Sequence, residues 1–164
     1  MRILGIDPGV ATTGWAIVDY DNDYHLVDFG VITTSKANEQ PDRLVEIYND
    51  INDIVSKYSP EYGGIELLLF NSNAKTVMAV GESRGVVILA LRKLGLPILQ
   101  FTPPQVKSTI AGSGRADKKQ VQENVKRLFN LDKLPSPDDA ADAVAVAVCC
   151  IDSIVMKQKA NINV

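Results

Sequence analysis

The chain has 164 residues, of which 46% are hydrophobic and 23% are charged, and its net charge at pH 7 is −3. This length and composition predict a single globular domain over residues 1–157, followed by a frayed C-terminal tail at residues 158–164. The longest apolar run, residues 143–151, is far shorter than the roughly 20 residues of a membrane helix, and the N-terminus has no features of a secretory signal. We therefore expect a cytoplasmic protein and exclude a membrane protein.

Sulfur and imidazole groups are scarce in this sequence. Cys149 and Cys150 are adjacent and lack the C-x-x-C spacing of redox and zinc sites, so they are expected to be small apolar residues of a buried helix. His25 is the only histidine, which argues against a histidine-rich zinc site and against a Ser-His-Asp triad. Any catalytic chemistry is expected to come from other residue types.

The N-terminal part of the chain predicts three neighbouring strands. Residues 1–6 form a short apolar run that ends at an Asp-Pro-Gly turn at residues 7–9, and residues 14–20 alternate as a second strand. Residues 24–34 are rich in β-branched and aromatic side chains, which favours a third strand. The chain is therefore expected to begin with a meander of three strands.

Helices and strands alternate in the remainder. Apolar residues between 41 and 58 recur at steps of three and four, which predicts an amphipathic helix, and the apolar run at 64–70 predicts a strand buried on both faces. The other expected elements are helices at residues 73–94, 118–129 and 138–156, a strand at 96–101 and a flexible connection at 111–114. The resulting order, βββαβαβαα, predicts an α/β fold with a mixed five-stranded sheet flanked by helices.

Two carboxylates stand in or beside apolar strands. Asp7 follows the first apolar run, and Glu66 interrupts the apolar run at 64–70. Burying an ionised carboxylate is unfavourable unless a partner or a metal ion compensates its charge. Asp7 also fits an ordinary turn before Pro-Gly, whereas Glu66 lies at neither a turn nor a cap. In adjacent strands the two side chains could converge.

A second acidic pair opens the last predicted helix. Asp139 and Asp142 are three residues apart and so share a helix face. Asp138 or Asp139 also fits an ordinary helix cap, a reading that does not extend to Asp142. Oxygen ligands without nearby histidine or cysteine favour magnesium or manganese over zinc. Two such ions about 4 Å apart can drive in-line cleavage of a phosphodiester.

Basic side chains gather in one segment of an otherwise acidic chain. Residues 105–127 contain six basic and two acidic side chains, a net charge of +4, so the rest of the chain carries −7. Such a run is usually a solvated helix face. It is also the one concentration of positive charge in the sequence that could bind the phosphates of a nucleic acid.

Several short motifs, taken together and in order, resemble those of the RuvC Holliday-junction resolvases. The matching segments are I-L-G-I-D-P-G at 3–9, I-E at 65–66, N-A-K-T at 73–76, G-E-S-R-G-V at 81–86, Q-V-K at 105–107 and D-A-A-D-A at 139–143. The match covers nearly the whole chain. The resemblance implies an RNase H-like fold, a homodimer, and paired symmetric nicks in four-way junction DNA driven by Mg²⁺, for which Mn²⁺ can substitute. It also implies the RuvA–RuvB branch-migration complex as a functional partner.

The resemblance further assigns individual residues. The family's metal-binding catalytic carboxylates, which hold two ions per site, match four residues here: Asp7, Glu66, Asp139 and Asp142. Asp138 does not match. Lys107 and Lys118 fall on basic positions near the active site, where a cation could steady the scissile phosphate. The DNA-binding residues expected beside these two are Arg115, Lys119, Leu69 and Phe70. The helix at 73–94, with Gly81 and Gly85 on one face, is expected at the dimer interface.

The sequence also departs from the resembled pattern. Leu67 and Leu69 stand where the family commonly has a polar residue and an aromatic residue, and Phe70 follows one position later. Gly63 and Gly64 replace a β-branched or aliphatic pair. We expect an intact metal site but a weaker ability to distort the junction.

Three other functions fit parts of the sequence. A YqgF-like RNA-processing nuclease shares the G-I-D-x-G start, although the D-A-A-D-A and Q-V-K segments favour a resolvase. A non-catalytic junction-binding protein would not need the four carboxylates. An actin-like or Hsp70-like ATPase also has a G-I-D-x-G phosphate loop, but 164 residues leave no room for its second lobe.

Overall fold

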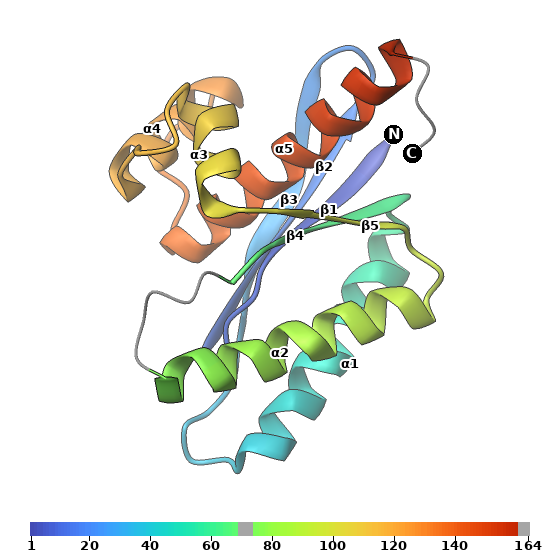
Figure 1. Cartoon of the computed structure of the whole chain (residues 1–164), viewed down its shortest axis with the longest axis vertical. Coiled ribbons are helices and arrows are strands. Elements are labelled where there is room, and N and C mark those ends of the chain that lie inside the picture. Colours follow the sequence, from blue (N-terminus) through green and yellow to red (C-terminus); the bar gives the residue numbers. More distant parts are fainter. Residues whose placement is uncertain (69–73, 161–164) are drawn as a thin grey trace.

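The computed structural model describes residues 1–68 and 74–160, and a five-stranded sheet forms its centre (Figure 1). The strands are β1 (Arg2–Asp7), β2 (Thr12–Tyr20), β3 (Tyr24–Thr33), β4 (Tyr62–Glu66) and β5 (Ile98–Phe101). Their spatial order is β3-β2-β1-β4-β5, with antiparallel pairing among the first three strands and parallel pairing of β4 with β1 and β5. The predicted mixed five-stranded sheet is confirmed.

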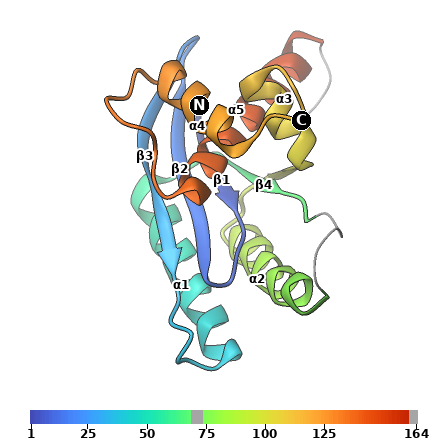
Figure 2. The same ribbon diagram turned by 90° about the vertical axis from the view of Figure 1, so that its left-hand side faces the viewer.

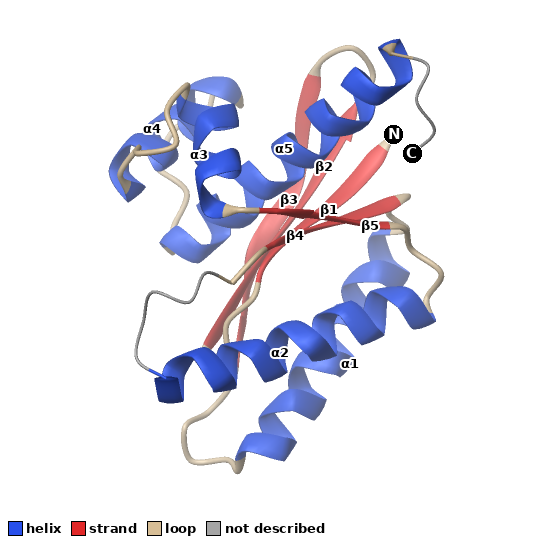
Figure 3. Ribbon diagram, viewed as in Figure 1, coloured by secondary structure: helices blue, strands red, loops and turns tan. Residues whose placement is uncertain are grey.

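Helices cover both faces of the sheet (Figures 1 and 3). On one face, α1 (Gln40–Tyr58) packs beside α2 (Ala74–Lys93). On the other lie α3 (Pro103–Ala111), α4 (Lys118–Leu128) and α5 (Asp138–Lys159), which contact one another. None of the described helices combines the length and the apolar character needed to span a bilayer.

The alternation of side chains along β1 divides the core into two layers. Leu4 and Ile6 pack with α1 and α2, whereas Ile3 packs with α5. Gly5 shares the face of Ile3, because successive strand residues point to opposite faces. The sheet is therefore buried on both sides along its central strand, which suits the continuous apolar run of β1.

Helix α5 lies against the sheet (Figure 2), and glycines on the facing strands allow it to come close. A Cβ atom at Gly5 would stand 2.2 Å from the Ala143 carbonyl oxygen, and one at Gly14 would stand 1.9 Å from the Asp139 carbonyl oxygen. The helix itself is rich in Ala, Val and Cys, and Cys149 and Cys150 are buried as expected. The glycines thus fix how near the start of α5 comes to β1 and β2.

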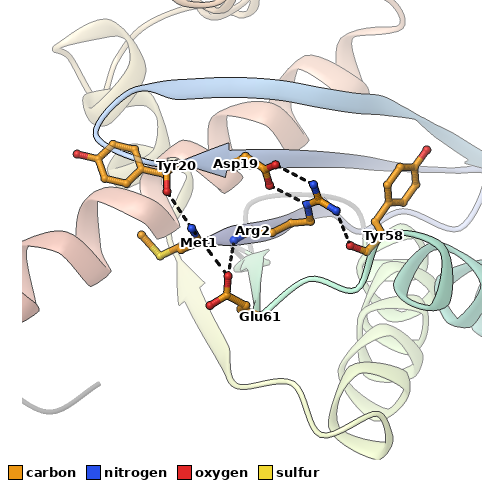
Figure 4. A network of polar contacts seen from close by, with 6 residues as sticks. All are labelled: Met1, Arg2, Asp19, Tyr20, Tyr58 and Glu61. Carbon is orange, nitrogen blue, oxygen red and sulfur yellow. Dashed lines mark hydrogen bonds and ion pairs between the residues drawn. The ribbon is translucent and has the colours of Figure 1, made fainter.

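A network of polar contacts holds the other end of β1 (Figure 4). The Arg2 guanidinium donates to both Asp19 carboxylate oxygens at 2.7 and 2.8 Å and to the Tyr58 carbonyl oxygen at 2.9 Å. The Glu61 carboxylate accepts from the Arg2 backbone N–H at 2.9 Å, and the Met1 ammonium donates to the Tyr20 carbonyl oxygen at 2.8 Å. These contacts tie β1 to β2 and to the chain that follows α1.

One helix and the ends of two other elements differ most from the sequence-based expectations. Helix α3 was not predicted, although a capping box between Thr102 and Gln105 marks its start. The strand expected at 64–70 ends at Glu66, because β5 offers no partner after Phe101, whose carbonyl accepts the last bond from the Leu67 N–H. Helix α5 continues beyond residue 156 to Lys159, so the expected frayed tail begins inside a helix.

Candidate active site

Asp7 and Glu66 end two neighbouring parallel strands. Ile6 is paired with Ile65 in the register of β1 and β4, so the next residues, Asp7 and Glu66, lie side by side at the same edge of the sheet. Gly64 packs against α5, as Gly5 does. Because side chains two residues apart share a face, both carboxylates point to the side that α5 covers. The convergence expected from the sequence is confirmed for this pair.

The first two turns of α5 bring the other carboxylates to the same place. Asp7 is paired with Gly14 across β1 and β2, and Gly14 is the residue that lets the Asp139 backbone approach the sheet. Asp142 follows one turn later on the same helix face. We refer to the four carboxylates as the acidic cluster, which consists of Asp7, Glu66, Asp139 and Asp142.

The members of the acidic cluster perturb one another's ionisation. Burial, followed by the charges of Glu66, Asp142 and Asp139, raises the pKa of Asp7 well above its usual range. Burial and the charge of Asp142 raise the pKa of Glu66 to about 7, although a hydrogen bond with Asp7 and the nearby lysines act in the opposite direction. Burial likewise raises the pKa of Asp139 and of Asp142. Gathering these carboxylates in one place is therefore electrostatically unfavourable in the protein alone.

Two lysines from the other helices offset part of this repulsion. Lys118, at the start of α4, lowers the pKa of every member of the acidic cluster, and Lys107, in α3, lowers the pKa of Glu66 and Asp142. Lys118 also forms an ion pair of 2.5 Å with Asp138, which raises the pKa of the lysine. Both lysines thus lie beside the carboxylates, where the sequence places them.

The ion pair gives Asp138 a position that sequence reasoning did not assign. The residue is not the N-cap of α5, which is Pro137. Instead it holds the Lys118 ammonium next to the acidic cluster. The sequence shows three aspartates close together at 138, 139 and 142. The resemblance assigns Asp139 and Asp142 to the site but not Asp138.

The donor set of the acidic cluster fits a hard divalent cation. All four groups are carboxylates on three elements of the fold, and a bound cation would offset both the burial and the mutual repulsion that raise their pKa values. In residues 1–68 and 74–160, however, no three acidic, histidine or cysteine side chains are already grouped closely enough to hold a metal ion.

Arg84 is a further residue beside the acidic cluster that the sequence did not single out. A small cavity of about 180 Å³ is lined by Asp7, Glu66 and Arg84 together with Pro8, Leu67, Leu68, Val80 and Pro103. The Arg84 guanidinium donates to the Gln100 side chain on β5, and its buried Nε has no hydrogen-bond partner in the described part of the chain. The G-E-S-R-G-V motif contains this arginine, but its spacing from Asp7 in sequence gave no sign of the contact.

The other predicted DNA-binding residues are exposed on the surface or lie outside the described residues. Arg115 is exposed in the loop between α3 and α4, and Lys119 is exposed in the first turn of α4. Leu69 and Phe70 lie outside the described residues. Gly63, one of the departures from the resembled pattern, faces the Leu91 side chain, whose Cδ1 would be 2.8 Å from an added Cβ. The larger leucine therefore occupies the space that a side chain at position 63 would need.

The chain is similar over most of its length to known junction endonucleases. Residues 3–150 match the family described as "Crossover junction endodeoxyribonuclease RuvC". The RuvC of Finegoldia magna is 48% identical over 152 residues, which cover 92% of this chain and 93% of that protein. The structure "T. thermophilus RuvC in complex with Holliday junction substrate" matches with a TM-score of 0.89 and 28% identity, over 95% of this chain and 96% of that one. The fold is RNase H-like, and the chain belongs to the RuvC family of crossover junction endodeoxyribonucleases.

Proposed function

We propose that this protein is a structure-selective endonuclease that resolves Holliday junctions by paired symmetric nicks, in DNA recombination and repair. The observation that carries the proposal is the meeting of the acidic cluster with Lys107 and Lys118 at one edge of the sheet. The similar Thermus thermophilus protein, whose structure includes a Holliday junction substrate, supports the choice of DNA substrate.

The proposed reaction is metal-dependent hydrolysis of a phosphodiester. The acidic cluster would hold two Mg²⁺ ions, or Mn²⁺ in their place, and bound ions of this kind activate a water molecule and offset the charge on the leaving oxygen. Asp7 and Glu66 are held rigidly by paired strands, so they fix one side of the site. Lys107 and Lys118 place positive charge where the scissile phosphate would lie, and Asp138 orients Lys118.

A homodimer is the proposed working form, because a four-way junction offers two symmetry-related strands to two equivalent sites. The outer face of α2 supports this proposal. Met78 and Leu89 are 70% and 54% exposed on this helix, and Cβ atoms added at Gly81 or Gly85 would meet no atom within 4 Å. An apolar face with small residues at its centre suits close packing against a second copy.

The proposed cellular setting is the cytoplasm, with the RuvA–RuvB branch-migration complex as the functional partner through the family resemblance. Arg115 and Lys119 are proposed to contact DNA outside the active site. Both are exposed, in the α3–α4 loop and in α4, and these helices lie on the face of the sheet that also carries Lys107 and Lys118. Leu69 and Phe70 remain proposed DNA contacts on the resemblance alone.

Mapping of the cut positions tests the proposed function. A four-way junction labelled on each strand in turn should be nicked in Mg²⁺ at two symmetric positions, while a linear duplex of the same sequence is cut far more slowly. A structured RNA should remain intact, which separates the resolvase from a YqgF-like nuclease. Binding of the junction without cutting in Mg²⁺ or Mn²⁺ would instead support a non-catalytic junction-binding protein.

A further inference from the structure

A larger hollow adjoins the acidic cluster from the side of α1 and α2. Its volume is about 660 Å³, and it is lined by residues 9–12 of the turn after β1, by Ala79 and Val80 of α2, and by Lys36, Arg43 and Asp139. Asp139 belongs to the acidic cluster, so the hollow opens directly beside the site. Lys36 reaches it from the connection between β3 and α1, and Arg43 from the first turn of α1, whereas Lys107 and Lys118 come from helices on the opposite face of the sheet (Figure 1).

Arg43 is fixed to the turn that follows β1. Its Nε donates a hydrogen bond of 2.8 Å to Thr34 Oγ1, and that hydroxyl donates to the Val10 carbonyl oxygen at 2.6 Å. The Thr34 backbone N–H also donates to the Ala11 carbonyl oxygen at 3.2 Å, and Thr34 is only 8% exposed. These bonds hold the arginine side chain through Nε and leave both terminal Nη groups unused by the tether.

The charges of these two residues are not neutralised by carboxylates. Arg2, Lys57 and Lys118 all form ion pairs with aspartates, but within the described residues neither Lys36 nor Arg43 does so. The chain as a whole is acidic, with a net charge of −3. Two uncompensated cations at the rim of a hollow therefore suit an anionic ligand, and a guanidinium held in place is well suited to a phosphate.

We infer that Lys36 and Arg43 bind a backbone phosphate of the cleaved DNA strand, next to the scissile phosphate and on the opposite side of it from Lys107 and Lys118. The inference rests on the proposed function and adds a second phosphate site to it. A strand crossing the acidic cluster would then be held by cations on both sides. This arrangement would align the scissile bond over carboxylates that themselves repel the DNA backbone.

The salt dependence of junction binding tests the contact without any cleavage. Affinity for a labelled four-way junction is measured at several salt concentrations in the absence of divalent metal, for Lys36→Gln, Arg43→Gln and Arg43→Lys. Each glutamine variant should reduce the slope of log affinity against log salt, and the double variant should reduce it by about 0.9, the value for one phosphate, so that the affinity lost between 50 and 200 mM salt becomes about threefold smaller. Arg43→Lys, which keeps the charge, should retain the wild-type slope.

The matched control is Lys57→Gln, which removes a cation from the same helix. Residue 57 lies 14 positions beyond Arg43, or about 21 Å along α1, and should leave the slope unchanged. Lys36 is exposed, so its variant is expected to fold normally even if Arg43→Gln lowers the melting temperature. If the wild type binds the junction but both Lys36→Gln and Arg43→Gln keep the wild-type slope, this inference is refuted and the proposed function is not. Failure of the wild type to bind the junction would overturn the proposed function as well.

Neutral methylphosphonate linkages locate the contact on the DNA. Single phosphates of the cleaved strand are replaced in turn by methylphosphonates. At one position flanking the nick, the replacement should weaken binding by the wild type but not binding by Lys36→Gln. Lys107→Gln should instead lose its sensitivity at the scissile phosphate, where Lys107 is proposed to lie. If Lys36→Gln and the wild type respond alike at every position, these residues do not contact the cleaved strand.

Discussion

Ser83, buried in α2, donates a hydrogen bond of 2.9 Å from its hydroxyl to the Gly9 carbonyl oxygen, two residues beyond Asp7. The same carbonyl accepts a bond of 2.5 Å from Thr13 Oγ1. The outer face of α2 is the proposed dimer interface. This bond therefore connects the interface helix with the turn after β1, next to Asp7. Small displacements of a catalytic group can change rates strongly.

Replacing Ser83 by alanine should therefore slow cleavage more than it weakens binding. We expect Ser83→Ala to lower the single-turnover cleavage rate by about threefold to thirtyfold, since Asp7 loses part of its support. Junction affinity should remain within about twofold, because no DNA-facing charge changes. The exposed Ser56→Ala on α1 serves as the control. A cleavage rate equal to that of this control would show that the bond does not position Asp7.

Metal binding should be visible as stabilisation in the absence of DNA. Burial and the neighbouring carboxylates raise the pKa of Asp7 in the metal-free fold. A raised carboxyl pKa lowers stability above the unfolded value, so Asp7→Asn should raise the melting temperature in EDTA at neutral pH. A gain of about 1 kcal/mol corresponds to roughly 2–4 °C for a protein of this size.

In millimolar Mg²⁺ or Mn²⁺, the wild type should have a higher melting temperature than Asp7→Asn, the reverse of their order in EDTA. A ligand that binds only the folded state stabilises it, so the metal should raise the melting temperature of the wild type more than that of Asp7→Asn. Asp53→Asn, on the exposed surface of α1, should behave like the wild type. Equal metal-induced shifts in Asp7→Asn and the wild type would place the metal elsewhere.

The dimer can be tested at a position that is open in the monomer. No atom lies within 4 Å of a Cβ atom added at Gly85, so Gly85→Lys should be tolerated within one chain. Two facing lysines at the centre of the proposed interface would repel each other and block close packing. Sedimentation should give a dimer for the wild type and a monomer for Gly85→Lys, with unchanged circular dichroism. A monomeric wild type, with and without junction DNA, would remove the basis for the dimer proposal.

The contact between Arg2 and Asp19 should make stability depend on acid pH (Figure 4). The Arg2 hydrogen bond lowers the pKa of Asp19 in the folded protein. A lowered pKa adds stability above the unfolded value, near pH 4, and that stability disappears as the pH falls through the folded value. Because the pair is partly exposed, Asp19→Asn should lose only about 0.5–1 kcal/mol at pH 7. Urea unfolding should show this difference shrinking below pH 4; a constant difference would mean that the carboxylate charge is irrelevant.

The site was more predictable from the sequence than the elements around it. Glu66 and Asp142 stood out because ionised side chains in apolar surroundings need compensation, a rule that holds before any fold is known. The end of β4 was misplaced because apolar residues continue after Glu66, whereas a strand also requires a partner, and β5 ends at Phe101. Helix α3 was missed because it has only 9 residues and opens with two prolines, although its capping box was present in the sequence.

Contacts between distant segments could not be predicted in the same way. Arg43 belongs to an ordinary amphipathic pattern, and only the packing of α1 beneath the turn after β1 brings it to Thr34 and the hollow. The pair of Lys118 and Asp138 likewise depends on the placement of α4 against α5. Charge and periodicity identify which residues are unusual, but the tertiary packing decides which of them meet.

Three aspartates at the start of α5 allow the most direct test of the acidic cluster. Asp142 and Asp139 are proposed metal ligands, whereas Asp138 only holds Lys118. The decisive measurement is the cleavage rate of a saturated four-way junction in Mg²⁺ for asparagine variants of these positions. Asp142→Asn and Asp139→Asn should each lower the rate by at least about a hundredfold, and Asp138→Asn by no more than about tenfold. Wild-type cleavage by Asp142→Asn, or an equally severe loss in Asp138→Asn, would contradict the proposed active site.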